Sequence, residues 1–378
     1  MLANFGFPGR MREDFKSMRS IFESVKFLKN NAALAVSLSL LAAVSAQASP
    51  GKNSAVISAG VPRAVSQAGA PAASAAQADS SKSGPLESKS VFEGGKCIDI
   101  WKGVEMPGNA CIKQEVCKGE PGRRWIWNVS KPRLEFFKPK TGKKTGLVIV
   151  CPGGAYGGLS ADNEGGSVAK WLVEHGVAAA ILWYRVPENM QGALYDILRA
   201  VRVARASADE LGIDPDKICV MGFSAGANLC ARASARYAAR SYKGLDDIDK
   251  ISARPDSACL IYPAYCDDPT FRALKIGAEP FDTDNPGYAQ RYALAQNLSV
   301  NKNTPPAFIV QTLEDTAYVN ASIAYFLALK DAGVDANLLL CSDGKHGYGL
   351  GLRNQGDLVS AWPQLFDKWL SINKYKGK

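Results

Sequence analysis

A serine stands between two glycines where the chain changes from a strand pattern to a helix pattern. The pentapeptide at 222–226 follows the apolar run 218–221 and precedes the Ala-rich stretch 227–240. Glycines are needed beside Ser224 because a side chain there would block the tight turn that exposes the hydroxyl. The pentapeptide alone is weak evidence. Its position between strand and helix is more specific and predicts that Ser224 is a nucleophile.

Short apolar runs alternate with amphipathic segments from residue 146 to the C-terminus. The expected strands are 146–151, 177–186, 218–221, 258–262, 307–312 and 336–341. The expected helices are 164–175, 193–211, 227–240, 320–332 and 357–373. Continuous apolar strands separated by such helices indicate an α/β fold, with a mostly parallel sheet covered by helices on both faces.

The N-terminal part of the chain has a different composition. Basic residues in 1–30 precede an apolar run at 32–44 and a small-residue site ending at Ala48, which predicts a signal peptide over 1–48. The apolar run is too short for a membrane anchor, so we expect a cleaved, secreted or periplasmic protein. Residues 49–90 are mostly Ala, Ser, Gly and Pro without an aromatic residue, which predicts a flexible linker.

The catalytic domain is expected to occupy 91–378. Its first part, 91–140, is rich in Gly, Pro and Trp, and we interpret it as an N-terminal extension that packs on the main sheet, with a strand at 133–137. Residues 264–305 lack periodicity between two strands. They form either a lid over the active site or an ordinary surface excursion.

Charge and cysteine content exclude several classes of function. The net charge of +9 is spread along the chain, which indicates a solvated surface rather than nucleic-acid binding. Four cysteines within apolar runs should be buried: Cys151, Cys219, Cys259 and Cys341. A disulfide is expected among Cys97, Cys111 and Cys117, with the pairing left open. Two histidines and no close Cys/His set argue against a zinc site, and no cofactor is expected.

A serine hydroxyl requires a neighbouring base before it can act as a nucleophile at neutral pH. The chain has two histidines. His346 lies in the glycine-rich stretch 343–349 after the last expected strand, whereas His175 lies near a helix end, where a surface or capping role is usual. The sequence therefore favours His346 as the base.

A carboxylate after the preceding strand would orient the imidazole. Glu314 and Asp315 both follow the strand at 307–312. We expect Asp315 to take this role, because its shorter side chain holds an imidazole more rigidly. Asp267 and Asp268, one strand earlier, are weaker candidates.

The glycine-rich run 152–158 directly follows the first parallel strand and predicts an oxyanion hole. A phosphate cradle would need a Gly-x-Gly-x-x-Gly spacing or a Gly-Lys-Ser/Thr ending, and the run has neither. The expected donors are the backbone N–H groups of Gly153, Gly154, Ala155 and Ala225. Tyr156 either lines the substrate pocket or packs inside the protein.

Five segments resemble bacterial α/β-hydrolases of the acetyl-xylan-esterase-like, carbohydrate-esterase type. They are 148–158, 212–218, 220–226, 252–256 and 345–350. The likeness extends over about 96–370. It implies an α/β-hydrolase fold, removal of acetyl groups from plant polysaccharides, and a catalytic triad of Ser224, Asp315 and His346.

Three positions differ from that group. Ala155 stands where a third glycine is common, Asn163 stands where a histidine is frequent, and the acidic pair at 314–315 is Glu-Asp instead of Asp-Asp. The first two differences bear on substrate preference.

The resulting hypothesis is a serine esterase that deacetylates xylan or related oligosaccharides through an acyl-enzyme. A feruloyl or general carboxylesterase and a prolyl-oligopeptidase-type peptidase are the alternatives. The peptidase is disfavoured because the residues before the hydrolase pattern are too few for a propeller domain. A non-enzymatic binding protein is least favoured, because all three triad residues are present. The oligomeric state is left open.

Overall fold

The computed structural model describes residues 90–239, 241–268 and 293–377. The predicted signal peptide at 1–48, all of the predicted linker except residue 90, and most of the 264–305 segment lie outside these ranges. The described residues contain no helix that is both long and apolar enough to cross a bilayer.

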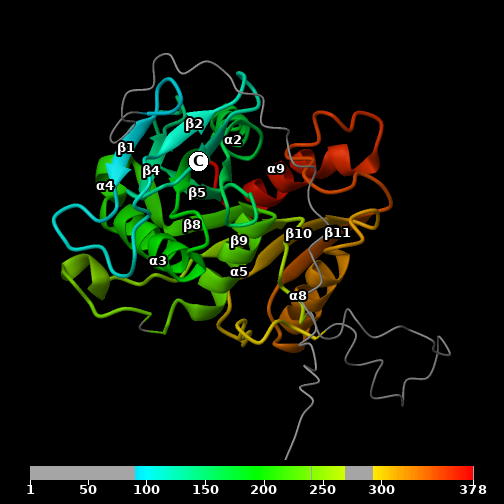
Figure 1. Ribbon diagram of the computed structural model, residues 1–378. Helices are drawn as coiled ribbons and strands as arrows, with labels where there is room; N and C mark the ends of the chain where they lie inside the picture. Colours follow the sequence, from blue (N-terminus) through cyan, green and yellow to red (C-terminus); the bar gives the residue numbers. More distant parts are fainter. Residues whose placement is uncertain (1–89, 240, 269–292, 378) are drawn as a thin grey trace, which may run out of the picture. The chain divides into compact units, whose positions relative to one another are not determined.

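An eight-stranded sheet forms the centre of the described structure (Figure 1). Its strands in chain order are β1 (Lys96–Asp99), β4 (Arg133–Phe137), β5 (Thr145–Cys151), β7 (Ala178–Trp183), β8 (Ile213–Phe223), β9 (Ser257–Ile261), β10 (Ala307–Thr312) and β11 (Ala336–Cys341). Their order in space is β1-β4-β7-β5-β8-β9-β10-β11. All pairs from β7 to β11 are parallel, whereas β1–β4 and β4–β7 are antiparallel. The predicted mostly parallel sheet is confirmed.

Helices cover both faces of this sheet. They are α2 (Ser167–Glu174), α3 (Met190–Ala206), α4 (Ala208–Leu211), α5 (Ala225–Arg236), α8 (Val319–Asp331) and α9 (Trp362–Ile372). Trp171 of α2 stacks on Phe366 of α9 on one face, while α3 and α5 pack together on the other (Figure 1). Because helices bury both faces, β5, β7, β9 and β10 are buried along their whole length.

Two predicted helices differ in detail from those observed. The segment predicted as a helix from 164 begins as a π-helical turn, η1 (Asp162–Gly166), before α2. The segment predicted at 193–211 starts earlier, because the Asn189 side chain accepts a hydrogen bond from the Gly192 N–H and so caps α3. Single helical turns also occur at η2 (Asp247–Lys250) and η3 (Leu358–Ala361).

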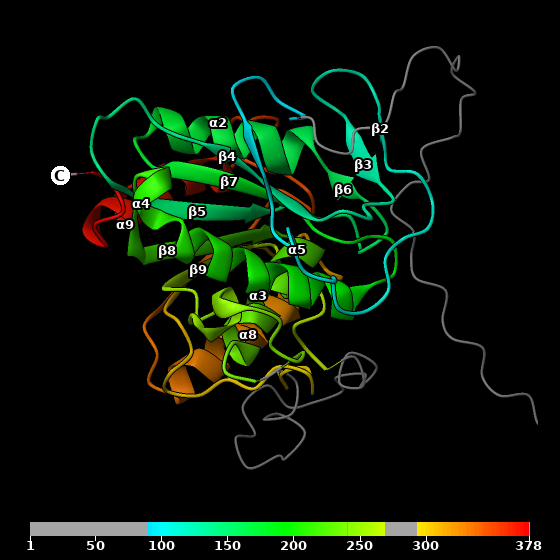
Figure 2. The ribbon, with the colours of Figure 1, turned by 90° about the vertical axis from the view of Figure 1, so that its left-hand side faces the viewer.

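A second, three-stranded sheet lies beyond the carboxyl ends of the main strands (Figure 2). It consists of β2 (Val116–Lys118), β3 (Trp125–Trp127) and β6 (Leu159–Ser160), all antiparallel. The segment 91–140 thus contributes β1 and β4 to the main sheet and β2 and β3 to the small one. Since β6 directly follows the glycine-rich run 152–158, the small sheet is attached to that run.

The cysteines are only partly as expected. Cys151, Cys219, Cys259 and Cys341 are buried, as predicted. Among the described residues, the structure forms no disulfide between Cys97, Cys111 and Cys117, which are partly buried thiols. The expectation of a disulfide among these three is therefore wrong for this structure. The described residues also contain no group of three or more His, Cys, Asp or Glu side chains arranged to hold a metal ion.

A completely buried ion pair joins the end of β7 to α3. The Arg185 guanidinium lies 2.8 Å from the Asp196 carboxylate, and both side chains are 0% exposed. The Trp101 indole N–H donates to the same carboxylate at 2.9 Å. Asp196→Ala would leave the Arg185 charge buried without its partner, so we expect a loss of about 3–5 kcal/mol in the free energy of unfolding. Urea denaturation measures this change.

The control for this variant is Glu210→Ala, which removes the exposed ion pair with Lys96. Solvent screens that pair, so this variant should unfold at nearly the wild-type urea concentration. If Asp196→Ala and Glu210→Ala lose the same free energy of unfolding, the larger contribution of the buried pair to stability is contradicted.

Candidate active site

Ser224 occupies a strained turn between β8 and α5, with φ of 52° and ψ of −119°. Its N–H donates to the Ile261 carbonyl at 3.0 Å, and its carbonyl accepts from the Ala264 N–H at 3.2 Å. A Cβ on Gly226 would lie 2.7 Å from the Pro152 carbonyl oxygen, which explains the glycine after the turn. Main-chain contacts to the end of β9 therefore hold the serine in a conformation that non-glycine residues rarely adopt.

The structure brings Ser224, His346 and Asp315 together. Nε2 of His346 lies 2.8 Å from Oγ of Ser224, and Nδ1 lies 2.7 Å from Oδ2 of Asp315. Asp315 follows β10 and its side chain is only 2% exposed, whereas that of His346 is 33% exposed. With the proton on Nδ1, this arrangement leaves Nε2 free to accept the serine proton.

The other candidates for the acid and the base lie elsewhere or make other contacts. Glu314 accepts a hydrogen bond from the Gly344 N–H at 3.2 Å, and so supports the loop that carries His346. His175 ends α2, where its ring stacks on Trp171 at 4.2 Å. Asp267 and Asp268 are buried after β9, whereas the two ring nitrogens of His346 lie against Asp315 and Ser224.

The glycine-rich run 152–158 lies beside the serine, but one of its predicted donors is wrong. The Gly153 N–H donates to Oε2 of the buried Glu164 at 2.7 Å, so it is not available to a substrate. Gly154 and Ala155 come next along the run, and Ala155 has a φ of 52°, the region in which glycine is favoured. Ala225 begins α5, where the first N–H groups have no acceptor within the helix. The N–H groups of Gly154, Ala155 and Ala225 remain the predicted donors.

Tyr156 is buried, with 3% of its surface exposed. Its hydroxyl donates to Oδ1 of Asn228 at 2.8 Å, and its ring meets Tyr184 edge-on at 6.2 Å. Burial raises its pKa far above the usual range for tyrosine. These contacts favour the packing interpretation, and a role of the Tyr156 side chain in the substrate pocket stays a prediction. Its carbonyl accepts a hydrogen bond from the Glu188 N–H at 2.8 Å.

Sequence reasoning missed a buried network behind the site. Glu164 accepts from the Tyr262 hydroxyl at 2.8 Å as well as from Gly153, and that hydroxyl accepts from the Gly349 N–H at 3.0 Å. The Tyr262 ring also contacts the His346 ring edge-on at 4.9 Å. The buried side chains of Glu164 and Tyr262 thus connect the glycine-rich run to the loop 343–349 that carries His346, called the histidine loop below. The sequence held one signal of this network, because Glu164 places a carboxylate in the first turn of a helix that was expected to lie on the apolar sheet.

Asn163, which stands where the resembled group often has a histidine, also contacts the histidine loop. Its side-chain amide donates to the Gly347 carbonyl at 3.3 Å. Gly349 has a φ of 56°, which favours glycine, and a Cβ there would lie 2.8 Å from Oδ1 of Asn163, so the amide would have to move. This difference from the group therefore affects how the histidine loop is held.

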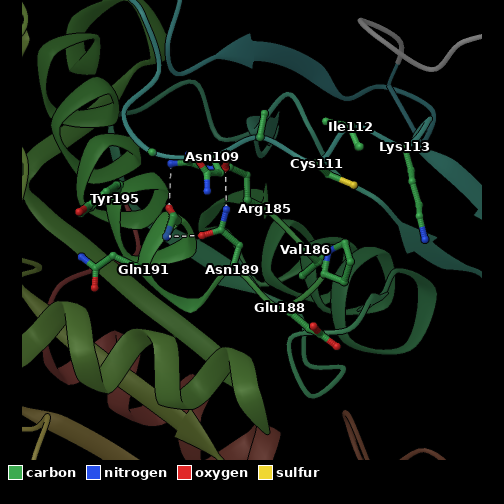
Figure 3. A pocket seen from close by; sticks show the side chains of 14 residues that line it. Asn109, Cys111, Ile112, Lys113, Arg185, Val186, Glu188, Asn189, Gln191 and Tyr195 are labelled. Carbon is green, nitrogen blue, oxygen red and sulfur yellow. Dashed lines mark hydrogen bonds between the residues drawn. The ribbon is translucent and has the colours of Figure 1, made fainter.

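A pocket of about 510 Å³ lies beside the glycine-rich run, between the 108–113 loop and the start of α3 (Figure 3). The Asn189 amide donates to the Asn109 carbonyl at 2.7 Å across its wall. Polar side chains from two stretches of the chain line it: Asn109, Lys113, Glu188, Asn189 and Gln191. The Glu188 N–H, bonded to Tyr156, connects this pocket to the run that adjoins Ser224.

Burial raises the pKa of Glu164, although hydrogen bonds from Tyr262 and Gly153 partly lower it. The folded protein therefore holds the Glu164 proton more tightly than the unfolded chain, so its stability falls as pH rises from the unfolded pKa, about 4.3, toward the raised one. Glu164→Gln cannot titrate. We expect the variant to be less stable than wild type, and the difference to shrink as pH rises above the unfolded pKa.

Urea denaturation at several pH values measures this difference. Glu174→Gln, at an exposed position on α2, is the matched control, and its stability should follow that of wild type at every pH. If the difference in unfolding free energy between wild type and Glu164→Gln does not change with pH, the raised pKa of Glu164 is contradicted.

Comparison with known proteins supports the fold. Residues 134–253 match the family model BD-FAE. The chain is 27% identical over 245 residues to an acetylxylan esterase of Xylanibacter ruminicola, covering 62% of this chain and 48% of that protein. It is 31% identical over 227 residues to endo-1,4-beta-xylanase B of Butyrivibrio fibrisolvens, covering 57% of this chain and 34% of that protein. The chain thus spans half or less of the length of these curated relatives.

Among solved structures, the chain is similar to an acetyl ester-xyloside bifunctional hydrolase from Caldicellulosiruptor lactoaceticus. The TM-score is 0.59 with 29% identity, covering 76% of this chain and all of that one. The Est2 esterase of Thermogutta terrifontis, with 21% identity and a TM-score of 0.51, shares the fold. The matches and the strand order show that the chain has an α/β-hydrolase fold and that it is similar to acetylxylan esterases.

Proposed function

We propose that the protein is a serine esterase that removes acetyl groups from xylan or related plant-polysaccharide fragments. The observation that carries the proposal is the chain of hydrogen bonds from Ser224 through His346 to the buried Asp315. The names of the relatives, an acetylxylan esterase and a xylanase, support an acetylated carbohydrate as the substrate and favour it over a feruloyl ester or a peptide.

In the first half of the reaction, Oγ of Ser224 attacks the ester carbonyl carbon while Nε2 of His346 takes the hydroxyl proton. The charge on the carbonyl oxygen is stabilised by the N–H groups of Ala225 and of Gly154 or Ala155. Asp315 stabilises the imidazolium that forms. As the carbon–oxygen bond breaks, His346 returns the proton to the sugar oxygen, and the acetyl group stays on the serine.

In the second half, a water molecule replaces the sugar. His346 takes a proton from the water as it attacks the acetyl carbonyl, and gives that proton back to Oγ of Ser224 when acetate leaves. The same donors stabilise the second oxyanion. The protein's own side chains thus supply every proton transfer in the cycle.

The domain organisation and location are part of the same proposal. A signal peptide at 1–48 would export the protein. A linker at 49–90 would separate the signal peptide from the catalytic domain at 91–378. Export supports the proposed function, because polymeric xylan lies outside the cell that degrades it.

Ser224→Ala should lower kcat/KM for p-nitrophenyl acetate by at least about 10⁴-fold, because it removes the nucleophile and leaves only the oxyanion donors and binding. Hydrolysis is followed by absorbance, and the melting temperature shows whether the variant is folded. A folded Ser224→Ala protein with wild-type activity would exclude Ser224 as the nucleophile.

Asp315→Asn and Glu314→Gln separate the two neighbouring acids. The first change should reduce kcat by about 10³–10⁴-fold, because an amide does not hold the required tautomer of His346 or stabilise its charged form. The second should change kcat only a little, because Glu314 bonds to a backbone N–H and not to the imidazole. The opposite order of effects would assign Glu314 as the acid.

A further inference from the structure

Two tryptophans of the small sheet form a stacked pair beside the candidate active site. Trp125 and Trp127 lie on β3, with ring centroids 5.8 Å apart and planes 21° from parallel. Residues two apart on a strand share a face, and Ile126 between them is completely buried. Trp127 is 39% exposed, which is unusual for so large an apolar side chain. The pair therefore presents aromatic surface to solvent.

The glycine-rich run places this pair next to the oxyanion donors. A Cβ on Gly154 would lie 2.9 Å from Cζ3 of Trp125, and a Cβ on Gly158 would lie 2.6 Å from Cε3 of Trp127. The neighbouring Gly153 adjoins the serine, since its Cβ would lie 2.9 Å from Cβ of Ser224. The indoles thus lie directly on the run whose N–H groups are predicted to hold the ester carbonyl.

The indole N–H groups of this pair differ from those of the buried tryptophans. Trp101, Trp183 and Trp362 each donate their N–H to a protein oxygen. Within the described ranges, Trp125 and Trp127 have no protein acceptor. The pair therefore offers a ligand both an apolar face and hydrogen-bond donors, which suits a molecule with apolar and polar surfaces.

We propose that Trp125 and Trp127 form a platform on which a pyranose ring of the acetylated substrate stacks. This inference rests on the proposed function and specifies how the carbohydrate is held. A pyranose ring has C–H groups on its faces and hydroxyls around its edge, so it matches an indole face. A single ester oxygen joins the ring to the acetyl carbonyl, so the ring must lie close to the donors at Gly154 and Ala155. The platform meets this requirement.

The pocket of Figure 3 is the competing place for the sugar. Its connection to the glycine-rich run is the hydrogen bond from the Glu188 N–H to the Tyr156 carbonyl, and the Tyr156 side chain points into the protein. In contrast, the Trp125 indole touches the run at Gly154 and the Trp127 indole touches it at Gly158. The contacts therefore favour the platform, and Gln191, which lines the pocket, provides a matched variant for testing the alternative.

The first experiment compares two substrates, acetylated xylo-oligosaccharides and p-nitrophenyl acetate. Trp127→Ala should lower the ratio of the two kcat/KM values, sugar ester over aryl ester, by about 3- to 10-fold through a higher KM for the sugar ester. Trp127→Phe should recover part of the loss, because a smaller ring still stacks. Gln191→Ala, and Ile372→Ala on the exposed side of α9, should leave the ratio unchanged. A change with Gln191→Ala and none with Trp127→Ala would overturn the platform.

The second experiment measures binding without catalysis. Calorimetric titration of Ser224→Ala with unacetylated xylohexaose should show binding that weakens when Trp127→Ala is added. Equal affinity with and without the indole would overturn the platform, even if wild type deacetylates xylan. If wild type hydrolyses neither ester, the proposed function fails, and the titration still reports on sugar binding. The two failures are thus distinguishable.

Discussion

The geometry of the site depends on the hydrogen bonds that the buried Glu164 carboxylate accepts. Glu164 is buried, with 5% of its surface exposed, and it accepts hydrogen bonds from the Gly153 N–H and the Tyr262 hydroxyl. Those two hydrogen bonds offset part of the cost of burying the carboxylate. Because Tyr262 also receives the Gly349 N–H, the loop after β5 and the loop after β11 share one anchor. The relative position of the predicted oxyanion donors and the imidazole is thereby set from inside the protein.

The parallel sheet explains how residues distant in sequence meet. Ser224 follows β8, Asp315 follows β10 and His346 follows β11, and these strands run in the same direction within one sheet. Their carboxyl ends therefore lie at one edge, which is where ligands bind in open α/β sheets. The small sheet of β2, β3 and β6 lies at the same edge (Figure 2), so the segment before the first parallel strand also contributes to the surroundings of the serine.

Sequence patterns predicted the parts of the molecule that depend on local chemistry. Buried parallel strands are continuously apolar, so their positions were visible, and the chain order of Ser224, Asp315 and His346 followed from topology. The contacts that the sequence did not indicate are made across the fold. Nothing near Gly153 indicates that its N–H donates to Glu164, and a tyrosine in a glycine-rich run gives no sign that Asn228, far along the chain, will bind its hydroxyl. The small sheet was also missed, because strands of two or three residues carry too few side chains to show an alternation.

Strand β9 supplies no reacting group, yet it determines where the nucleophile stands. The carbonyl of Ile261 and the N–H of Ala264 bracket the main chain of Ser224 and keep it in its left-handed conformation. Tyr262, between them, belongs to the anchor shared by the two loops. Any change that shifts β9 along its neighbours would consequently displace the Ser224 hydroxyl from the His346 imidazole, although both side chains would remain present.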